Sequence, residues 1–154
     1  MINYKERYEF YKNLIEDKLL TFTTKVSPVG IYEPMKYILD GGGKRIRPML
    51  LILCCEAVGG KADDALNAAT AIEILHNFTL VHDDIMDNAD TRRGRETIHK
   101  KWDRDTAILA GDGLIGYAYK SLLHTKSDRI QDVAKSFTEA IIEVCEGQSY
   151  DKEF

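Results

Sequence analysis

Three aspartates stand close together near the middle of the chain: Asp83, Asp84 and Asp87, in the segment Asp-Asp-Ile-Met-Asp. On a helix, residues three and four positions apart share a face, so Asp87 would lie one turn beyond the two earlier carboxylates. Like charges at that separation repel one another unless a cation lies among them. Oxygen ligands without cysteine favour Mg²⁺, which proteins bind through one or two carboxylates together with substrate phosphates. The alternative is a solvated acidic helix end that binds nothing.

Two basic segments could supply anion sites. Residues 40–47 read DGGGKRIR, and Lys44, Arg45 and Arg47 add three cations to glycines whose backbone amides can approach an anion closely. The segment is not a P-loop, because Lys44 is followed by Arg rather than by Ser or Thr. The second segment, residues 92–95, reads RRGR and could hold another anion through planar guanidinium forks. The alternative for both is a flexible turn with a solvated basic face.

His76, Phe78 and Thr79 precede the aspartates on the same predicted helix. His76 is two turns before Asp83, or ~10.5 Å along the axis, a gap that suits a ligand longer than one phosphate. A lone histidine at such a position can also be an ordinary core residue. At 100° per residue, Thr79 lies about 40° from Asp83 and Phe78 about 140° from it, so Thr79 is more directly beneath the aspartate.

Helices must position these residues. Apolar residues at steps of three and four predict six of them, over about residues 4–22, 34–40, 48–58, 63–84 and 106–123 and from 127 onward. Asp63 is the predicted N-cap of the fourth helix. The third is apolar nearly all round, so we expect it in the interior. The sequence shows no strand run and no hairpin dipeptide, which predicts an all-α bundle of about six helices.

Composition limits the function classes. The chain has 154 residues, 44% hydrophobic and 30% charged, which suits one soluble helical domain over residues 1–154. Its net charge of −4 is too acidic for a dedicated nucleic-acid binder. The longest apolar run, Met49–Cys55, is far shorter than the roughly 20 residues of a transmembrane helix. No signal peptide is evident, and adjacent Cys54 and Cys55 suggest buried thiols, so we expect a reducing, cytoplasmic location.

The order of the motifs resembles the trans-isoprenyl diphosphate synthases, or polyprenyl synthetases. GGGKRIRP is followed by an internal histidine, then DDIMD, then RRG, and Ala110-Gly111-Asp112 and Gly147-Gln148 with Asp151 also match family landmarks. The resemblance covers essentially the whole chain and implies the first half of the isoprenoid synthase fold. It also implies a Mg²⁺-dependent transferase, a prenyltransferase that joins isopentenyl diphosphate to an allylic diphosphate.

The resemblance assigns a role to each motif residue. Asp83, Asp84 and Asp87 would form the catalytic metal motif, with Asp83 and Asp87 bridging Mg²⁺ to the allylic diphosphate, which Arg92 would also contact. An aromatic residue at the position of Phe78 would floor the product cavity and favour a C15–C20 product, although Phe78 could equally be ordinary core. The residues implied for the diphosphate of isopentenyl diphosphate are Gly43, Lys44, Arg47, His76 and Arg93.

The chain departs from this family in length, because family members are about twice as long. Their second half supplies another aspartate-rich motif, and nothing in this chain matches it. We therefore expect the 154-residue form to be weak or inactive and to expose an apolar patch. The resemblance also implies a homodimer, because the family's dimer interface is built largely from the fifth and sixth helices, which this chain retains. Two alternatives stay open: a non-catalytic binding or regulatory partner of a full-length synthase, and a helical metal-dependent phosphohydrolase, prompted by His82-Asp83.

Overall fold

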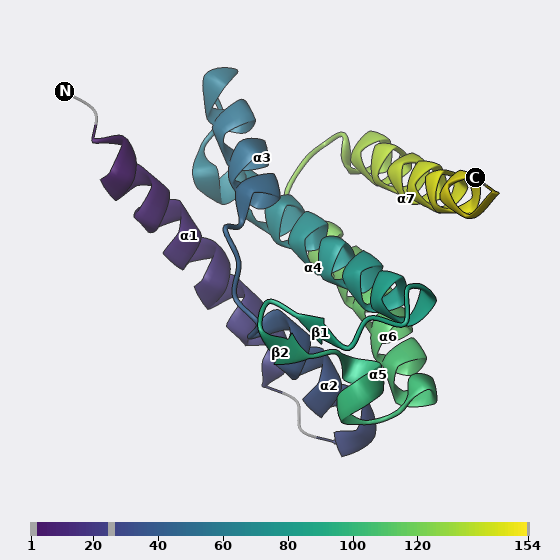
Figure 1. Ribbon diagram of the computed structural model, residues 1–154. Helices are drawn as coiled ribbons and strands as arrows, with labels where there is room; N and C mark the ends of the chain where they lie inside the picture. The colour runs from purple at the N-terminus through teal and green to yellow at the C-terminus, as the bar shows by residue number, and fades with distance from the viewer. Residues whose placement is uncertain (1–2, 25–26, 154) are drawn as a thin grey trace.

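Helix α4, Ala62–Met86, is the longest element of the computed structural model and runs through the middle of the molecule (Figure 1). The structure describes residues 3–24 and 27–153, so the predicted domain limits, Met1 and Phe154, lie outside the described residues. The other elements in chain order are α1 Tyr4–Leu20, the 3₁₀ turn η1 Thr21–Thr23, α2 Val29–Leu39, α3 Ile46–Ala57, β1 Thr91–Arg92, β2 Arg95–Glu96, α5 Ile98–Lys101, α6 Arg104–Leu122 and α7 Ile130–Glu153. The predicted all-α class is confirmed. None of the described helices is both long and apolar enough to cross a bilayer.

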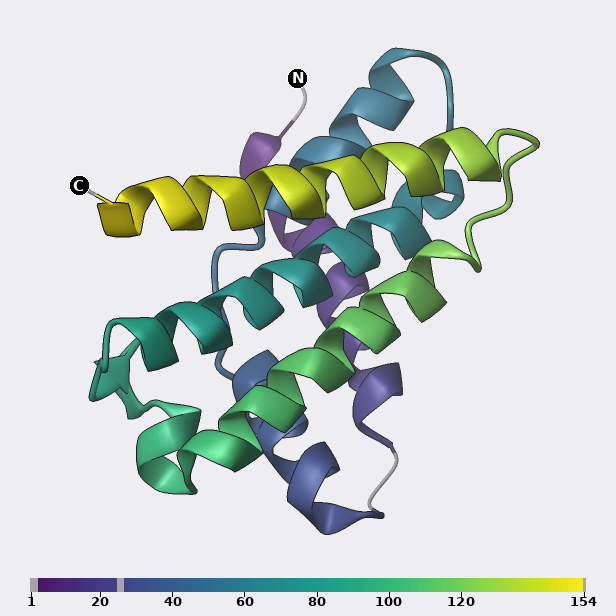
Figure 2. The ribbon, with the colours of Figure 1, turned by 90° about the vertical axis from the view of Figure 1, so that its right-hand side faces the viewer.

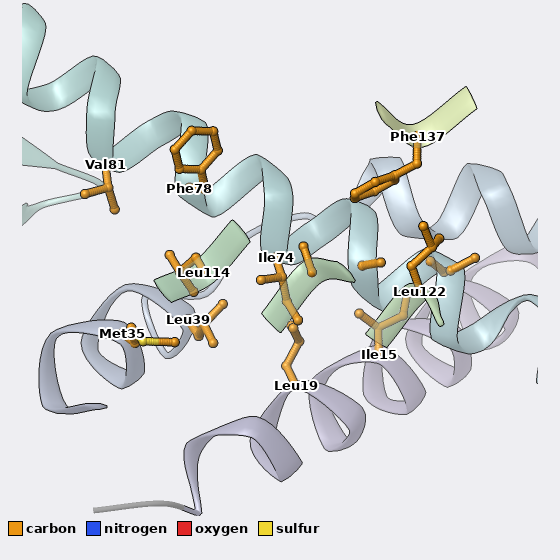
Figure 3. Packing of buried hydrophobic residues seen from close by; sticks show 14 of the residues in the cluster. Ile15, Leu19, Met35, Leu39, Ile74, Phe78, Val81, Leu114, Leu122 and Phe137 are labelled. Carbon is orange, nitrogen blue, oxygen red and sulfur yellow. The ribbon is translucent and has the colours of Figure 1, made fainter. Parts of the chain in front are cut away.

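Small residues let the other helices approach α4 closely. Its buried alanines, such as Ala69 and Ala71, allow α6 and α3 to pack against it, and α6 runs antiparallel beside it (Figure 2). Gly111 of α6 lies so near His82 of α4 that a Cβ there would overlap the imidazole ring. Larger apolar side chains fill the rest of the core. There Ile74 of α4 lies among residues from α1, α2 and α6 (Figure 3): Leu19, Leu39, Leu114 and Leu122.

The starts of α2 and α4 differ from the prediction. Helix α2 begins at Val29 rather than near Pro34, and Pro34 lies inside it. Proline in a helix removes one backbone hydrogen bond, but the side chain of Pro34 is fully buried, so packing outweighs that loss. Helix α4 begins at Ala62, and Asp63 is not its N-cap. Its neighbour Asp64 instead accepts a hydrogen bond from the backbone N–H of Lys61 at 2.9 Å.

The expectation that the third helix is internal is wrong. Helix α3 packs against α4 and α1 and buries only Pro48, Met49 and Ile52, whereas Leu50 on its other side is 55% exposed. Cys54 is also exposed, so the expected burial of that thiol is wrong as well. The apolar side of α3 around Leu50 is therefore left largely exposed by the described residues.

A short hairpin replaces part of the segment between α4 and α6, against the expectation of no strands. Strands β1 and β2 are antiparallel, with Arg92 opposite Arg95. The two turn residues, Arg93 and Gly94, both have positive φ, of 53° and 76°, which is the pattern of a type I′ hairpin turn. Arginine is unusual at the first turn position, so the dipeptide gave no hairpin signal. The hairpin rests on Tyr37 of α2, whose ring lies 3.8 Å from the Arg95 guanidinium.

Helix α7 stands apart from the bundle at the right of Figure 1 and runs in the same general direction as α4 (Figure 2). It begins at Ile130, three residues after the predicted start, and Phe137 is the one buried residue along it. Val133, Ala134 and Ile141 pack against the core while only partly buried, the hydroxyls of Tyr119 and Thr138 are 2.8 Å apart, and Gln148 reaches Asp83. The small number of buried residues leaves a groove between α7 and α4.

Candidate active site

A basic cavity of about 470 Å³ lies where the glycine-rich segment meets α4 and the hairpin turn. It contains all five residues that the sequence assigned to one diphosphate, although they come from three separate parts of the chain. Arg45, Ile46 and Glu73 complete its lining. The five predicted residues brought together are Gly43, Lys44, Arg47, His76 and Arg93.

The guanidinium of Arg93, in the hairpin turn, packs against the backbone of Gly42 and Gly43. Gly42 has a φ of 68°, a conformation that favours glycine, and its carbonyl accepts a hydrogen bond from Arg93 Nη1. The Arg93 guanidinium also lies against Gly43, where a Cβ would stand only 3.1 Å from Nη1. The Tyr8 hydroxyl of α1 donates to the carbonyl of Lys44 at 3.0 Å. The glycine segment is thus held between α1 and the hairpin.

Most cations of this cavity face no carboxylate. Within residues 3–24 and 27–153, Lys44, Arg47 and Arg93 form no ion pair. Burial lowers the pKa of Arg93, and nearby Arg45 lowers it further. Burial likewise lowers the pKa of His76, with Arg47 as the next cause. Because these three cations form no ion pair with the described residues, a bound anion would stabilise their charged forms.

Arg45 is the exception among the three cations of the glycine-rich segment. It is 3% exposed and forms ion pairs with Glu16 of α1 and Glu73 of α4, at 2.8 and 2.6 Å. Its interpretation as a third free cation is therefore wrong, because its guanidinium is already saturated by the protein. Sequence reasoning missed both glutamates. The sequence did offer one signal for a buried partner of Arg45: Glu73 is an isolated acid among the apolar residues of α4.

A second, larger cavity of about 930 Å³ occupies the groove between α4 and α7. It shares Arg47 and His76 with the basic cavity and reaches Asp83 at its other end. Apolar side chains make up most of the rest of its wall: Leu51, Ala68, Ile72, Leu75, Leu80, Leu122, Val133, Phe137, Ala140 and Val144. The basic cavity therefore opens directly onto an apolar groove.

Thr79 and Phe78 take different positions relative to that groove. Thr79 lines it, as the helical-wheel geometry predicts. Phe78 (Figure 3) is buried and is not among the lining residues. Its ring centroid lies 4.6 Å from that of His82. Thr79 is therefore the residue of this pair beside which a ligand in the groove would lie.

The three aspartates do not converge. Asp84 is buried and accepts a hydrogen bond from Arg92 Nε at 2.7 Å, whereas Asp87 is exposed. Asp83 accepts from Gln148 Nε2 at 3.1 Å, and Arg92 Nη2 lies 3.5 Å from it. Burial raises the pKa of Asp84, and Arg92 offsets only part of that effect. Across the described residues, no group of three or more His, Cys, Asp or Glu side chains could hold a metal ion.

A divalent cation nevertheless fits part of this site. Asp83 and Asp87 lie one helical turn apart at the end of α4, and both are accessible to solvent. Mg²⁺ usually takes one or two carboxylates and completes its coordination with water and substrate phosphates. These two aspartates match that requirement. Asp84 does not, because Arg92 already occupies its carboxylate.

Comparison with known proteins gives consistent matches. A family model described as Polyprenyl synthetase matches residues 28–154. A geranylgeranyl diphosphate synthase of Methanosarcina mazei is 44% identical over 90% of this chain, which covers 42% of that protein. A short chain isoprenyl diphosphate synthase of Methanocaldococcus jannaschii is 41% identical over 94% of the chain and 45% of its own length. The chain thus spans less than half the length of both relatives.

Solved structures agree with the sequence relatives. The crystal structure of geranylgeranyl pyrophosphate synthetase from Pyrococcus horikoshii superimposes with a TM-score of 0.93 at 38% identity. That match covers 99% of this chain and 48% of the other. A second crystal structure of a geranylgeranyl pyrophosphate synthase gives a TM-score of 0.91 at 46% identity, over 96% of this chain and 45% of that one.

Proposed function

This chain belongs to the polyprenyl synthetase family, and from that premise we propose that it carries the diphosphate-binding half of a Mg²⁺-dependent prenyltransferase. In this proposal its single helical domain binds isopentenyl diphosphate and an allylic diphosphate, whose condensation gives a C15–C20 polyprenyl diphosphate. One observation carries the proposal: the basic cavity opens, through the shared residues Arg47 and His76, onto an apolar groove that reaches Asp83. That order of charge and apolar wall suits two diphosphates with a hydrocarbon chain between them.

The basic cavity is proposed to bind isopentenyl diphosphate. Lys44, Arg47 and Arg93 supply cations that form no ion pair with the described residues, and His76 stands at the boundary with the groove. Gly43 lets the backbone lie flat against the Arg93 guanidinium. Since the proposed site contains no competing carboxylate except Glu73, which pairs with Arg45, these cations are available to a diphosphate.

The allylic diphosphate is proposed to bind at the end of α4. Asp83 and Asp87 would hold the Mg²⁺, which when bound neutralises charge on the diphosphate. Arg92, held by Asp84, stabilises the pyrophosphate as the allylic C–O bond breaks and its electron pair leaves with the oxygen. The isopentenyl double bond then forms the new C–C bond, and a proton leaves to the released diphosphate. The apolar walls of the groove exclude water, which would otherwise quench the carbocation.

Chain length is proposed to depend on the groove wall beneath Asp83. Thr79 lines the groove directly, whereas Phe78 packs behind it against His82. Bulk at position 79 would therefore shorten the space for the growing chain. The family role of an aromatic residue at position 78 stays a prediction for this chain.

Assembly and location complete the proposal. Helix α6 exposes Ile108 and Leu109, and Leu123 just beyond it is 62% exposed, a surface that suits a homodimer contact. The exposed side of α3 around Leu50 suits contact with a further helical part of a synthase. A cytoplasmic location agrees with three free cysteines, which oxidising compartments tend to pair.

The proposal is tested on the purified 154-residue chain. Isothermal titration calorimetry with inorganic pyrophosphate should show binding that Mg²⁺ strengthens. Incubation with radiolabelled isopentenyl diphosphate and farnesyl diphosphate should give at most traces of a longer product. Absence of pyrophosphate binding would refute the proposed sites. Efficient Mg²⁺-dependent elongation, with the chain's mass verified, would refute the weak turnover expected of this form.

Two alternatives give different results. A non-catalytic partner would co-purify with a full-length synthase and change its product or rate while remaining inactive alone. A phosphohydrolase would release phosphate from a generic phosphate ester, with Mn²⁺ more effective than Mg²⁺. His82, which prompted that second alternative, lies 3.7 Å from Asp112 and packs against Gly111, and no metal-binding group surrounds it among the described residues.

A further inference from the structure

Arg45 joins four helices through one guanidinium group. Its Nε and Nη2 donate to the two carboxylate oxygens of Glu16 on α1, at 2.8 and 3.2 Å. Nη1 donates to Glu73 on α4 at 2.6 Å, and Nη2 also donates to the carbonyl of Leu39 at the end of α2, at 2.9 Å. Arg45 itself precedes the first turn of α3. We call Glu16, Arg45 and Glu73 the buried ionic triad.

The backbone of Arg45 is held in an unfavourable conformation. Its φ and ψ are 49° and 36°, in the left-handed region that is unfavourable for a residue with a Cβ. The side-chain contacts of the buried ionic triad offset that cost, because they are charge-assisted and include a bidentate pair. The conformation also separates Arg45 from its neighbours: Arg45 is buried, whereas Lys44 and Arg47 are exposed and line the basic cavity.

The charges of the triad are unequal. Two carboxylates face one guanidinium, and Glu73 lines the same cavity as Lys44, Arg47 and Arg93. Without this acid, the free protein would hold a cluster of cations with no counter-charge nearby. Glu16 differs from Glu73 because it is not among the lining residues of the basic cavity. Glu16 therefore reaches the cavity only through Arg45.

We propose that Glu16 and Glu73 are positioning residues for diphosphate binding, which act through Arg45 to fix the turn that presents Lys44 and Arg47 to the basic cavity. This inference rests on the proposed function, because it assumes that a diphosphate binds there. Neither glutamate touches the ligand in this arrangement. The triad sets the geometry of the two cations that do.

Glu16→Gln separates positioning from simple electrostatics. Removing a negative charge near an anion site should tighten anion binding if charge alone matters. Loss of the bidentate pair should instead weaken binding if the triad positions the loop. We expect Glu16→Gln to lower the affinity for inorganic pyrophosphate about tenfold, the effect of one charge-assisted hydrogen bond, measured by isothermal titration calorimetry on the 154-residue chain. Arg45→Lys keeps the charge but loses the planar fork, and should weaken binding similarly.

Glu56→Gln is the matched control. Glu56 of α3 pairs with Arg7 and accepts from Tyr11 of α1, so it also ties α1 to α3, but it does not line the basic cavity. Its loss should lower the thermal midpoint without changing pyrophosphate affinity. Two-dimensional NMR should show amide shifts at residues 43–47 for Glu16→Gln and not for Glu56→Gln. This comparison distinguishes positioning from general destabilisation.

Each possible result either supports or overturns the positioning role of Glu16 and Glu73. Folded Glu16→Gln and Arg45→Lys proteins that bind pyrophosphate as well as, or more tightly than, the unaltered chain would overturn the positioning role and leave the proposed function intact. Equal weakening by Glu56→Gln at an equal loss of thermal midpoint would also overturn it. An unaltered chain that binds no pyrophosphate would refute the proposed function, and the positioning role with it.

Discussion

Arg92 Nε lies 2.7 Å from the buried carboxylate of Asp84, while the neighbouring Asp83 faces the groove. Adjacent aspartates on one helix thus have different tasks. Asp84 orients an arginine that the proposed function places at the allylic diphosphate, and Asp83 remains available for Mg²⁺. The three acids therefore differ: Asp87 is exposed, Asp83 is partly exposed and contacts Gln148 and Arg92, and Asp84 is buried against Arg92.

The first prediction concerns these two tasks. Asp83→Asn and Asp87→Asn should each abolish most of the Mg²⁺-dependent gain in pyrophosphate affinity, because each removes a hard oxygen ligand. Asp84→Asn should retain that gain but weaken binding in metal-free buffer, because Arg92 loses its charged partner. Calorimetry with and without Mg²⁺ measures both effects. Identical behaviour of all three variants would contradict the division of roles.

The second prediction concerns the free cations of the basic cavity. Lys44→Ala and Arg47→Ala should each lower pyrophosphate affinity about tenfold in metal-free buffer, and the loss should shrink as salt screens the site. Lys5→Ala, an exposed lysine in the first turn of α1, is the control and should bind as the unaltered chain does. Equal effects at Lys5 and Lys44 would indicate non-specific charge attraction instead of a site.

The third prediction concerns pH. Burial, with Arg47, holds the pKa of His76 below its ordinary value of 6.5 in the folded protein. As the pH falls below about 6.5, the unfolded chain therefore takes up this proton first, and the free energy of unfolding should decrease. Pyrophosphate should reduce this decrease, because an anion favours the charged imidazole. Urea unfolding at a series of pH values from about 5 to 8, on both sides of the ordinary histidine pKa, measures how the free energy of unfolding depends on pH.

His76→Gln should remove this part of the pH dependence. His124→Gln, an exposed histidine just beyond α6, should keep it. If His76→Gln left the slope unchanged, the titrating group would have to be another residue.

The fourth prediction concerns the contact between α4 and α6. Gly111→Ala should lower the free energy of unfolding by about 1–3 kcal/mol, because the new methyl group would overlap His82. Gly116→Ala, in the same helix but with open space around its Cα, should be neutral or raise stability by about 0.5–1 kcal/mol. Denaturant unfolding measures both variants. A Gly111→Ala protein as stable as the unaltered chain would show that α6 can move away from His82.

The fifth prediction concerns the groove wall. Thr79→Phe should weaken farnesyl diphosphate binding about tenfold or more and leave pyrophosphate binding nearly unchanged, because only the hydrocarbon chain needs the space beside Thr79. Phe78→Leu should have the smaller effect on farnesyl diphosphate, since Phe78 does not line the groove. Calorimetry with the two ligands gives the comparison, and the reverse ranking would place Phe78 at the cavity floor.

Much of the fold follows from the sequence alone. Apolar spacing identified the long helices, and the motif order identified five residues that meet in one cavity although they come from three separate parts of the chain. Elements with strong periodicity were found because their packing and their local preference agree. Their starts were less certain: Pro34 marks a helix start in isolation, but its burial allows α2 to begin earlier.

The details of the site could not be read in the same way. Lys44, Arg45 and Arg47 look alike in the sequence, and only the acids of α1 and α4 decide that Arg45 is buried. Asp83 and Asp84 are likewise indistinguishable until the hairpin brings Arg92 Nε to 2.7 Å from Asp84 and Arg92 Nη2 only to 3.5 Å from Asp83. That hairpin depends on an arginine with positive φ, held by a carbonyl distant in sequence. Long-range contacts set each of these choices, and no local pattern reports them.

The sparse attachment of α7 has a consequence for cooperativity. Since Phe137 is the one buried residue between Ile130 and Glu153, α7 should open as a separate unit at a lower free energy than the bundle of α1, α4 and α6. Its amides should exchange with deuterium long before those around Ile74. Opening would also release Gln148 from Asp83. The α7 side of the groove should thus be less protected than the α4 side, and a ligand that fills the groove should slow exchange in α7.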